Sequence, residues 1–380
     1  MNSSLRFALE CASVLLLVAG CGGTDGGQKT LEAGKQAYEL RDLGKAAKCF
    51  EKSVLQTPDN VDALVYLARV RMELGELAAA KDAIARAVAL APADSDVELL
   101  SAQIAWHSKD YTAAAKGFRS VADNVKFPPE VRADGWAGVG IVEMTCNNRD
   151  EARIAFLRAI QLDRRNASAR YHLALLYRDA FGYDKIALEQ FEIFQRLEVS
   201  ASPRVQKVQR SVIPGIKESI ARNETERPGV ATRNSGACAA SIAKGAAAVK
   251  KGNHKAARQF YQEAFAADPL SYPAAIGLAK AWQNADKTSN GSMKAFEAYK
   301  TACTLNEGAI GTFLTAGSLA FQLGLYVQAV EIYSRALAAS PNSIDAADGL
   351  IRALRKVGGK QKIVDAYAAY RQTLARKKRK

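Results

Sequence analysis

The side chains most able to do chemistry are scattered along this 380-residue sequence. The three histidines, His107, His172 and His254, lie far apart and belong to no HExxH or Cys/His spacing, so no metal site is expected. Ser241 and Lys244 match the S-x-x-K pattern of some serine nucleophiles, but its companion motifs are missing and both residues fall in a predicted helix. Phosphate-binding glycine loops are also missing. The sequence therefore predicts a protein that is not an enzyme and needs no cofactor.

Cys21 is the residue best placed for a covalent modification. An apolar stretch over residues 12–19 precedes it and is too short to cross a bilayer, which is typical of a secretory signal. The tetrapeptide Val18-Ala19-Gly20-Cys21 resembles the lipobox of bacterial lipoproteins, in which the signal is cleaved before a cysteine that then carries the lipid. The resemblance predicts a signal peptide over 1–20, a lipid on Cys21 and a flexible glycine-rich spacer over 21–27. An ordinary cleaved signal with an incidental cysteine is the alternative.

A period of 34 residues runs through most of the chain. It is carried by small residues and by large apolar residues four positions later: Ala46, Ala80 and Ala114, followed by Phe50, Ile84 and Phe118. The same pattern ends in a proline around Pro341, and each unit indicates two antiparallel helices. This period and pattern resemble the tetratricopeptide repeat. The resemblance implies an all-α fold, an α-solenoid of helix-turn-helix repeats.

The repeats fall into two predicted arrays. About five occupy residues 28–200 and about four occupy 237–375. Between them, residues 201–236 are interpreted as a capping helix and a linker that leaves the arrays some freedom. The helix is expected because apolar residues recur at three and four positions and form one face: Val205, Val208, Val212, Ile216 and Ile220. This face could cover the open end of the first array, next to the bulky Phe191 and Phe194.

Four cysteines remain beyond the signal and the lipid site, and all are expected to be free thiols. Cys49 and Cys146 lie three repeats apart. At roughly 10 Å for each helix layer, that separation exceeds the limit of about 7 Å between the Cα atoms of a disulfide. The other two are Cys238 and Cys303.

The positive charge of the chain is concentrated at its end. The formal net charge is +14, and residues 350–380 alone contribute +10. An evenly basic surface, as expected of a nucleic-acid-binding protein, is therefore not indicated. The last five residues form a basic tail that could contact an anionic lipid or a cell-wall polymer, or could serve only as a solvated end: Arg376, Lys377, Lys378, Arg379 and Lys380.

A second candidate surface follows from the repeat. Large residues recur near the ends of the first helices of successive repeats: Tyr38, Met72, Trp106 and Met144, with Arg178 34 residues after Met144. In this repeat family the first helices line the concave face, so the residues could form a groove for an extended peptide or a partner helix. Packing between neighbouring first helices is the alternative. The lysine and asparagine set that clamps a terminal carboxylate in some family members is missing.

These features together predict a membrane-anchored scaffold of the bacterial cell envelope that binds another protein in its groove. Gly22 after the cysteine is similar to lipoproteins of the outer membrane, where the chain would face the periplasm. The chain resembles repeat lipoproteins that act as pilotins, assembly adaptors or polysaccharide-secretion scaffolds. The alternative is a module that binds an anionic polymer or membrane surface through the basic tail.

The lipid on Cys21 can be tested directly. We expect Cys21→Ala to abolish labelling of the protein by a fatty-acid analogue in cells, because the acylated thiol is removed. Cys49→Ala, which changes a cysteine outside the lipobox, should keep full labelling. Unchanged labelling of Cys21→Ala would contradict the prediction.

Overall fold

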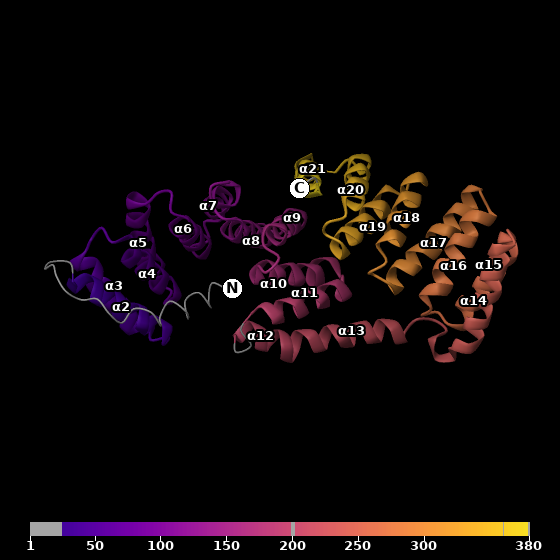
Figure 1. Ribbon diagram of the computed structural model, residues 1–380, viewed down its shortest axis with the longest axis horizontal. Helices are drawn as coiled ribbons and strands as arrows, with labels where there is room; N and C mark the ends of the chain where they lie inside the picture. The colour runs from indigo at the N-terminus through magenta and orange to yellow at the C-terminus, as the bar shows by residue number, and fades with distance from the viewer. Residues whose placement is uncertain (1–24, 199–201, 360, 379–380) are drawn as a thin grey trace. The chain divides into compact units, whose positions relative to one another are not determined.

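Every regular element that the computed structural model describes is a helix, which confirms the predicted all-α solenoid fold (Figure 1). The described residues are 25–198, 202–359 and 361–378. Cys21, with the rest of the chain up to residue 24, lies outside them, as do Arg379 and Lys380. The chain forms two compact units, unit 1 up to Ala114 and unit 2 from Ala115.

Unit 1 contains the helices of the first repeats. They are α2 (Asp25–Glu39), α3 (Leu43–Gln56), α4 (Val61–Glu73), α5 (Leu77–Leu90) and α6 (Ser95–His107), and α7 (Tyr111–Asp123) continues into unit 2. Asp42, Asn60 and Asp94 cap α3, α4 and α6, because the side-chain oxygen of each accepts a backbone N–H of the first turn. The sequence therefore sets the start of these helices locally.

Unit 2 contains the remaining repeats and the segment between the two predicted arrays. The first helices are α8 (Pro129–Thr145), α9 (Arg149–Leu162), α10 (Ala167–Leu176), the π-helical turn η1 (Tyr177–Phe181) and α11 (Asp184–Leu197). The intervening segment holds α12 (Pro203–Lys207), the π-helical turn η2 (Val208–Val212), α13 (Ile213–Thr225) and the short 3₁₀ turn η3 (Val230–Thr232). The last helices are α14 (Ser235–Lys250), α15 (His254–Ala267), α16 (Tyr272–Ala285), α17 (Ser289–Leu305), α18 (Ile310–Gln322), α19 (Tyr326–Ala339), α20 (Ile344–Val357) and α21 (Gln361–Lys378). Helix α21 thus extends into the predicted basic tail.

The pairing of small and large residues explains why the helices of one repeat pack closely. A Cβ atom added at Gly140 of α8 would lie 2.5 Å from Cε1 of Phe156 on α9. A Cβ atom at Gly317 of α18 would likewise lie 2.7 Å from Cζ of Tyr333 on α19. The aromatic ring occupies the space that a side chain on the first helix would need, so the repeat depends on a small residue there.

The turn inside each early repeat needs a left-handed residue. Gly75 adopts a φ of 81° there, as glycine readily does. Arg41 and Lys109 occupy the same position 34 residues on either side, with φ values of 60° and 61°. Their positive φ was not predicted, because a lysine or arginine at this position carries no local signal for it.

The predicted capping helix packs where the sequence indicated. Val205 and Val208 are buried with Phe191 and Phe194 of α11 in one hydrophobic cluster. The π-helical turn η2 precedes Pro214, which lies in the first turn of α13, where a missing N–H removes no helical hydrogen bond. In Figure 1, α12 and α13 run alongside α10 and α11 and lead toward α14.

The segment after α13, predicted to be a linker, is hydrogen-bonded to the second array. The Arg227 Nη2 donates to Thr304 Oγ1 at 2.9 Å. Arg233 forms an ion pair with Asp268 at 3.0 Å, and the Asn234 N–H donates to the carbonyl of Ala267 at 2.8 Å. These contacts attach the segment to α15 and α17 over its whole length.

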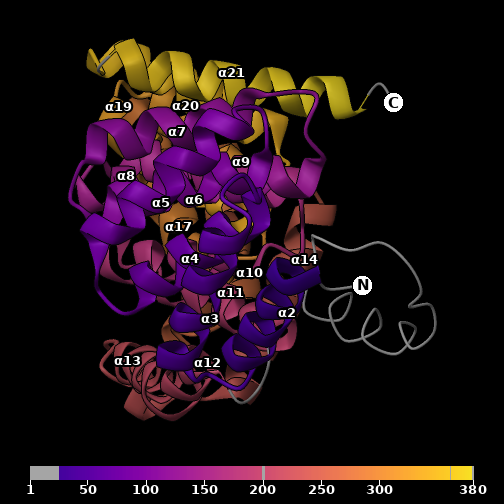
Figure 2. The ribbon, with the colours of Figure 1, turned by 90° about the vertical axis from the view of Figure 1, so that its left-hand side faces the viewer.

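Helices of the two predicted arrays contact each other within unit 2, which the sequence did not predict. Helix α21 packs on α9, and Figures 1 and 2 show it beside α9 and α20. Arg153 of α9 is 2% exposed, and its Nη2 donates to Tyr367 Oη of α21. At the edges of this interface, Thr373 donates to Gln161 at 2.8 Å and Lys362 lies 3.8 Å from Glu151. The array boundaries at residues 200 and 237 stay predictions.

The close approach at Gly317 provides a test of the repeat packing. We expect Gly317→Leu to lower the free energy of unfolding by about 1–3 kcal/mol, because the buried Tyr333 ring has no room to move aside. Gly311→Leu in the same helix is the control, since no atom lies within 4 Å of a Cβ there. Urea denaturation followed by circular dichroism measures both. Equal stabilities of the two variants would show that this packing does not limit the fold.

Candidate functional site

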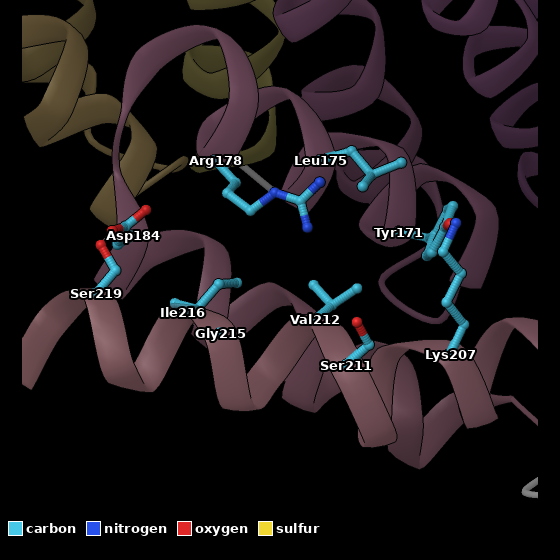
Figure 3. Close-up of a pocket in the computed structure, with 10 residues that line it drawn as sticks. All are labelled: Tyr171, Leu175, Arg178, Asp184, Lys207, Ser211, Val212, Gly215, Ile216 and Ser219. Atoms are coloured by element: carbon cyan, nitrogen blue, oxygen red, sulfur yellow. Dashed lines mark hydrogen bonds between the residues drawn. The ribbon is translucent and has the colours of Figure 1, made fainter.

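A cleft of about 500 Å³ lies between α10 and the capping segment η2–α13 (Figure 3). Its two walls come from segments that are separate in the sequence. Three side chains come from α10 and η1, and one from the start of α11: Tyr171, Leu175, Arg178 and Asp184. The facing wall is lined by Lys207, Ser211, Val212, Gly215, Ile216 and Ser219.

Helical spacing explains why these residues share the cleft. Tyr171, Leu175 and Arg178 follow one another at four and three positions and so lie on one face of the helix. On the facing wall, Lys207, Ser211, Gly215 and Ser219 recur every four positions. A Cβ atom at Gly215 would meet no atom within 4 Å, so the middle of this wall is open.

The floor of the cleft is apolar and its ends are polar. Leu175, Val212 and Ile216 point toward one another across the cleft in Figure 3. At one end Ser219 Oγ donates to Asp184 Oδ2 at 2.7 Å. Lys207 is exposed and marks the other end, beside Tyr171.

The Arg178 guanidinium is held by a neighbouring carboxylate. Its Nε and Nη2 donate to the two oxygens of Asp179 at 2.5 and 2.9 Å. These hydrogen bonds raise the pKa of Arg178, so the group stays charged. Figure 3 shows the guanidinium directed into the cleft.

His172 lies behind the Tyr171 wall and is held by ring contacts. Its ring stacks on Phe156 at 5.9 Å between centroids and meets Tyr171 edge-on at 5.1 Å. Its Nδ1–H donates to the carbonyl of Ser168 at 2.8 Å. Burial lowers the pKa of His172 to about 4, an effect that the Ser168 hydrogen bond opposes and the charge of Arg204 reinforces.

The predicted groove residues do not form one site in either unit. In unit 1, Tyr38 and Met72 are partly buried against the core, and the Tyr38 hydroxyl donates to Glu73. Burial, and then the Glu73 contact, raise the pKa of Tyr38 to about 12. Trp106 is half-buried and meets His107 edge-on at 4.8 Å. A binding role for these three side chains stays a prediction.

The other predicted site residues lie in unit 2. Met144 is partly buried on α8, and Arg178 is the one member of the predicted groove that lines the cleft. Arg376 is exposed near the end of α21, and the backbone of Lys377 and Lys378 continues that helix. The role of the tail also stays a prediction.

Sequence reasoning missed most of the cleft. It identified Val212 and Ile216, but only as part of a face that covers the end of the array. The residues that turn this contact into a cleft, Lys207, Ser211 and Gly215, carry no signal except their spacing of four. Tyr171 and Leu175 could have been found because they share a helix face with Arg178.

Models of the tetratricopeptide repeat match two parts of the chain, residues 37–104 and 240–269. The chain contains tetratricopeptide repeats. No curated protein matches the sequence significantly.

Among solved structures, PilF of Pseudomonas aeruginosa is 15% identical and covers 68% of this chain and 100% of its own, with a TM-score of 0.41. A thermophilic tetratricopeptide protein of Thermus thermophilus is 20% identical, with coverages of 50% and 99% and a TM-score of 0.43. YrrB, described as having an unusual peptide-binding site, is 14% identical, with coverages of 48% and 90% and a TM-score of 0.33. Identities this low do not transfer a partner to this chain.

Metal ligands and membrane-spanning helices were both sought among the described residues. Within residues 25–198, 202–359 and 361–378, histidine, cysteine, aspartate and glutamate side chains form no group of three that could hold a metal ion. None of the described helices has the length and apolar character needed to span a membrane. The four cysteines Cys49, Cys146, Cys238 and Cys303 are free.

The lowered pKa of His172 predicts a pH-dependent stability. Its pKa is about 4 in the folded chain and about 6.5 when unfolded, so between these values only the unfolded chain binds the proton. The free energy of unfolding should therefore be highest above pH 6.5 and fall by on the order of 2 kcal/mol toward pH 4. Urea denaturation at several pH values measures this, and His172→Gln should flatten the dependence. The same slope in both proteins would contradict it.

Proposed function

We propose that the chain is a non-enzymatic scaffold that binds a segment of another protein, and that the cleft between α10 and η2–α13 is one place where it does so. The observation that carries this proposal is the apolar floor of the cleft, formed by Leu175, Val212 and Ile216 and open to solvent above Gly215. Apolar area in a concave site stabilises a bound segment by about 25 cal/mol per Å² removed from water.

The lining residues favour binding over catalysis. Neither serine of the cleft has a histidine beside it, and Ser219 is already committed to Asp184. A serine nucleophile needs a base within hydrogen-bond reach. The repeats support the same conclusion, because arrays of this kind present extended surfaces to other proteins.

The location that we propose rests on the sequence alone. The apolar stretch 12–19 and the tetrapeptide ending in Cys21 support a lipid anchor in the bacterial envelope, in the outer membrane facing the periplasm. The bound protein would then be another envelope protein, for example part of a secretion, pilus or polysaccharide-export apparatus.

The cleft can be tested by photo-crosslinking in cells. We expect a photo-reactive amino acid at Ser211, which lines the cleft, to give one discrete adduct that mass spectrometry can identify. The same group at Gln209, an exposed residue of the same turn outside the cleft, is the matched control and should give little adduct. Leu175→Trp should reduce the Ser211 adduct several-fold, because the larger ring fills the cleft.

Two outcomes would contradict this proposal. Equal adducts from Ser211 and Gln209 would show that the cleft is not the binding surface. If removal of residues 376–380 abolishes recovery of the adduct and Leu175→Trp has no effect, the basic tail is the binding element, as the anionic-polymer or membrane-surface alternative predicts.

A further inference from the structure

We propose that the segment held in the cleft is acidic and aliphatic: it presents a carboxylate to Lys207 and Arg178 beside a leucine, isoleucine or valine side chain on the apolar floor. This inference rests on the function proposed above and specifies the chemistry of the partner. It follows from the charge of one wall, the orientation of Arg178 and the distribution of acidic groups.

The capping segment gives the cleft a basic wall. Residues 203–217 contain four cations and no aspartate or glutamate: Arg204, Lys207, Arg210 and Lys217. Lys207 lines the cleft, is exposed, and forms no ion pair with any described residue. An unpaired cation at the edge of an apolar surface attracts an acidic partner and repels a basic one.

Arg178 supplies a second, positioned cation. Asp179 occupies Nε and Nη2, which leaves the N–H groups of Nη1 available. Because Asp179 fixes the guanidinium plane, little side-chain entropy is lost when Nη1 donates to a carboxylate. Figure 3 places Lys207 and Arg178 on opposite walls, so both can reach a segment lying between them.

The remaining lining residues exclude a uniform polyanion. Asp184 lies at one end of the cleft, and Asp179 flanks Arg178. A chain of phosphates would be repelled by both carboxylates, whereas a peptide can place a single carboxylate away from them. Tyr171 is the one aromatic ring in the lining, which gives little surface on which nucleobases could stack. An acidic, aliphatic peptide fits better than a nucleic acid.

The probe for this inference is a random 12-residue peptide library displayed on phage and selected on the full chain. We expect selected peptides to carry an aspartate or glutamate next to an aliphatic residue. Fluorescence anisotropy of the synthesised peptides should show binding that weakens with added salt. Leu175→Trp should abolish it, which locates the peptides in the cleft.

Charge reversal tests the two cations against a matched control. Lys207→Glu should weaken binding about tenfold and Arg178→Glu by at least as much, as expected for a lost charge-assisted hydrogen bond. Lys217→Glu makes the same charge change on an exposed residue of α13 outside the cleft and should weaken binding less than twofold. Lys207→Arg, which keeps the charge, should retain affinity. Far-UV circular dichroism checks that each variant is folded.

The outcomes separate this inference from the proposed function. If peptides bind and Leu175→Trp abolishes the binding, but they lack acidic residues or respond equally to Lys207→Glu and Lys217→Glu, the acidic chemistry is wrong and the cleft remains a binding site. If no selected peptide depends on Leu175, both the inference and the cleft as a binding site are wrong.

Discussion

The burial of a single guanidinium is the constraint on which the arrangement of unit 2 depends. Arg153 of α9 donates through Nη2 to Asp150 at 2.5 Å, and also to Tyr367, while its guanidinium lies 4.5 Å from the ring centre of Phe181. Burial lowers the pKa of Arg153, but the nearby Tyr367 and Asp150 more than offset this and raise it above its ordinary value. A charge so far from water is tolerated only with such partners. Since Tyr367 belongs to α21, α9 can bury Arg153 in this way only when the last repeat packs on it.

The π-helical turn η1 connects this buried cluster with the candidate site. Tyr177 and Phe181, at its two ends, lie on the side of Arg153, and Tyr177 is fully buried. Arg178, between them, faces the cleft (Figure 3). Gly182 closes the turn at a φ of 65°, which glycine adopts without strain. The position of the cleft cation is therefore set by the same five residues that cover the buried arginine.

The cleft itself results from how one helix covers another. The capping segment buries Val205 and Val208 against the last repeat of the first array, but its wall opens at Gly215, where a side chain is missing. A complete contact would only close the end of the array, as terminal repeats must. The incomplete contact leaves apolar surface beside Lys207 and Arg178, and the combination suits a partner segment that is both aliphatic and charged.

The sequence by itself determined the features that depend on neighbouring residues. The 34-residue period, the small residue opposite Phe156 or Tyr333, and the apolar face at Val205 and Val208 could all be predicted, because each reports contacts within a repeat or with the next element. The lipid site at Cys21 is also a local pattern, although it lies outside the described residues.

Only the tertiary structure decided the contact between Arg153 and Tyr367, which are 214 residues apart, and the cleft that brings Arg178 and Lys207 together. The physical reason is that a small rotation between successive repeats accumulates along a solenoid. Where distant helices meet therefore depends on the sum of many packing angles, and no local pattern records that sum.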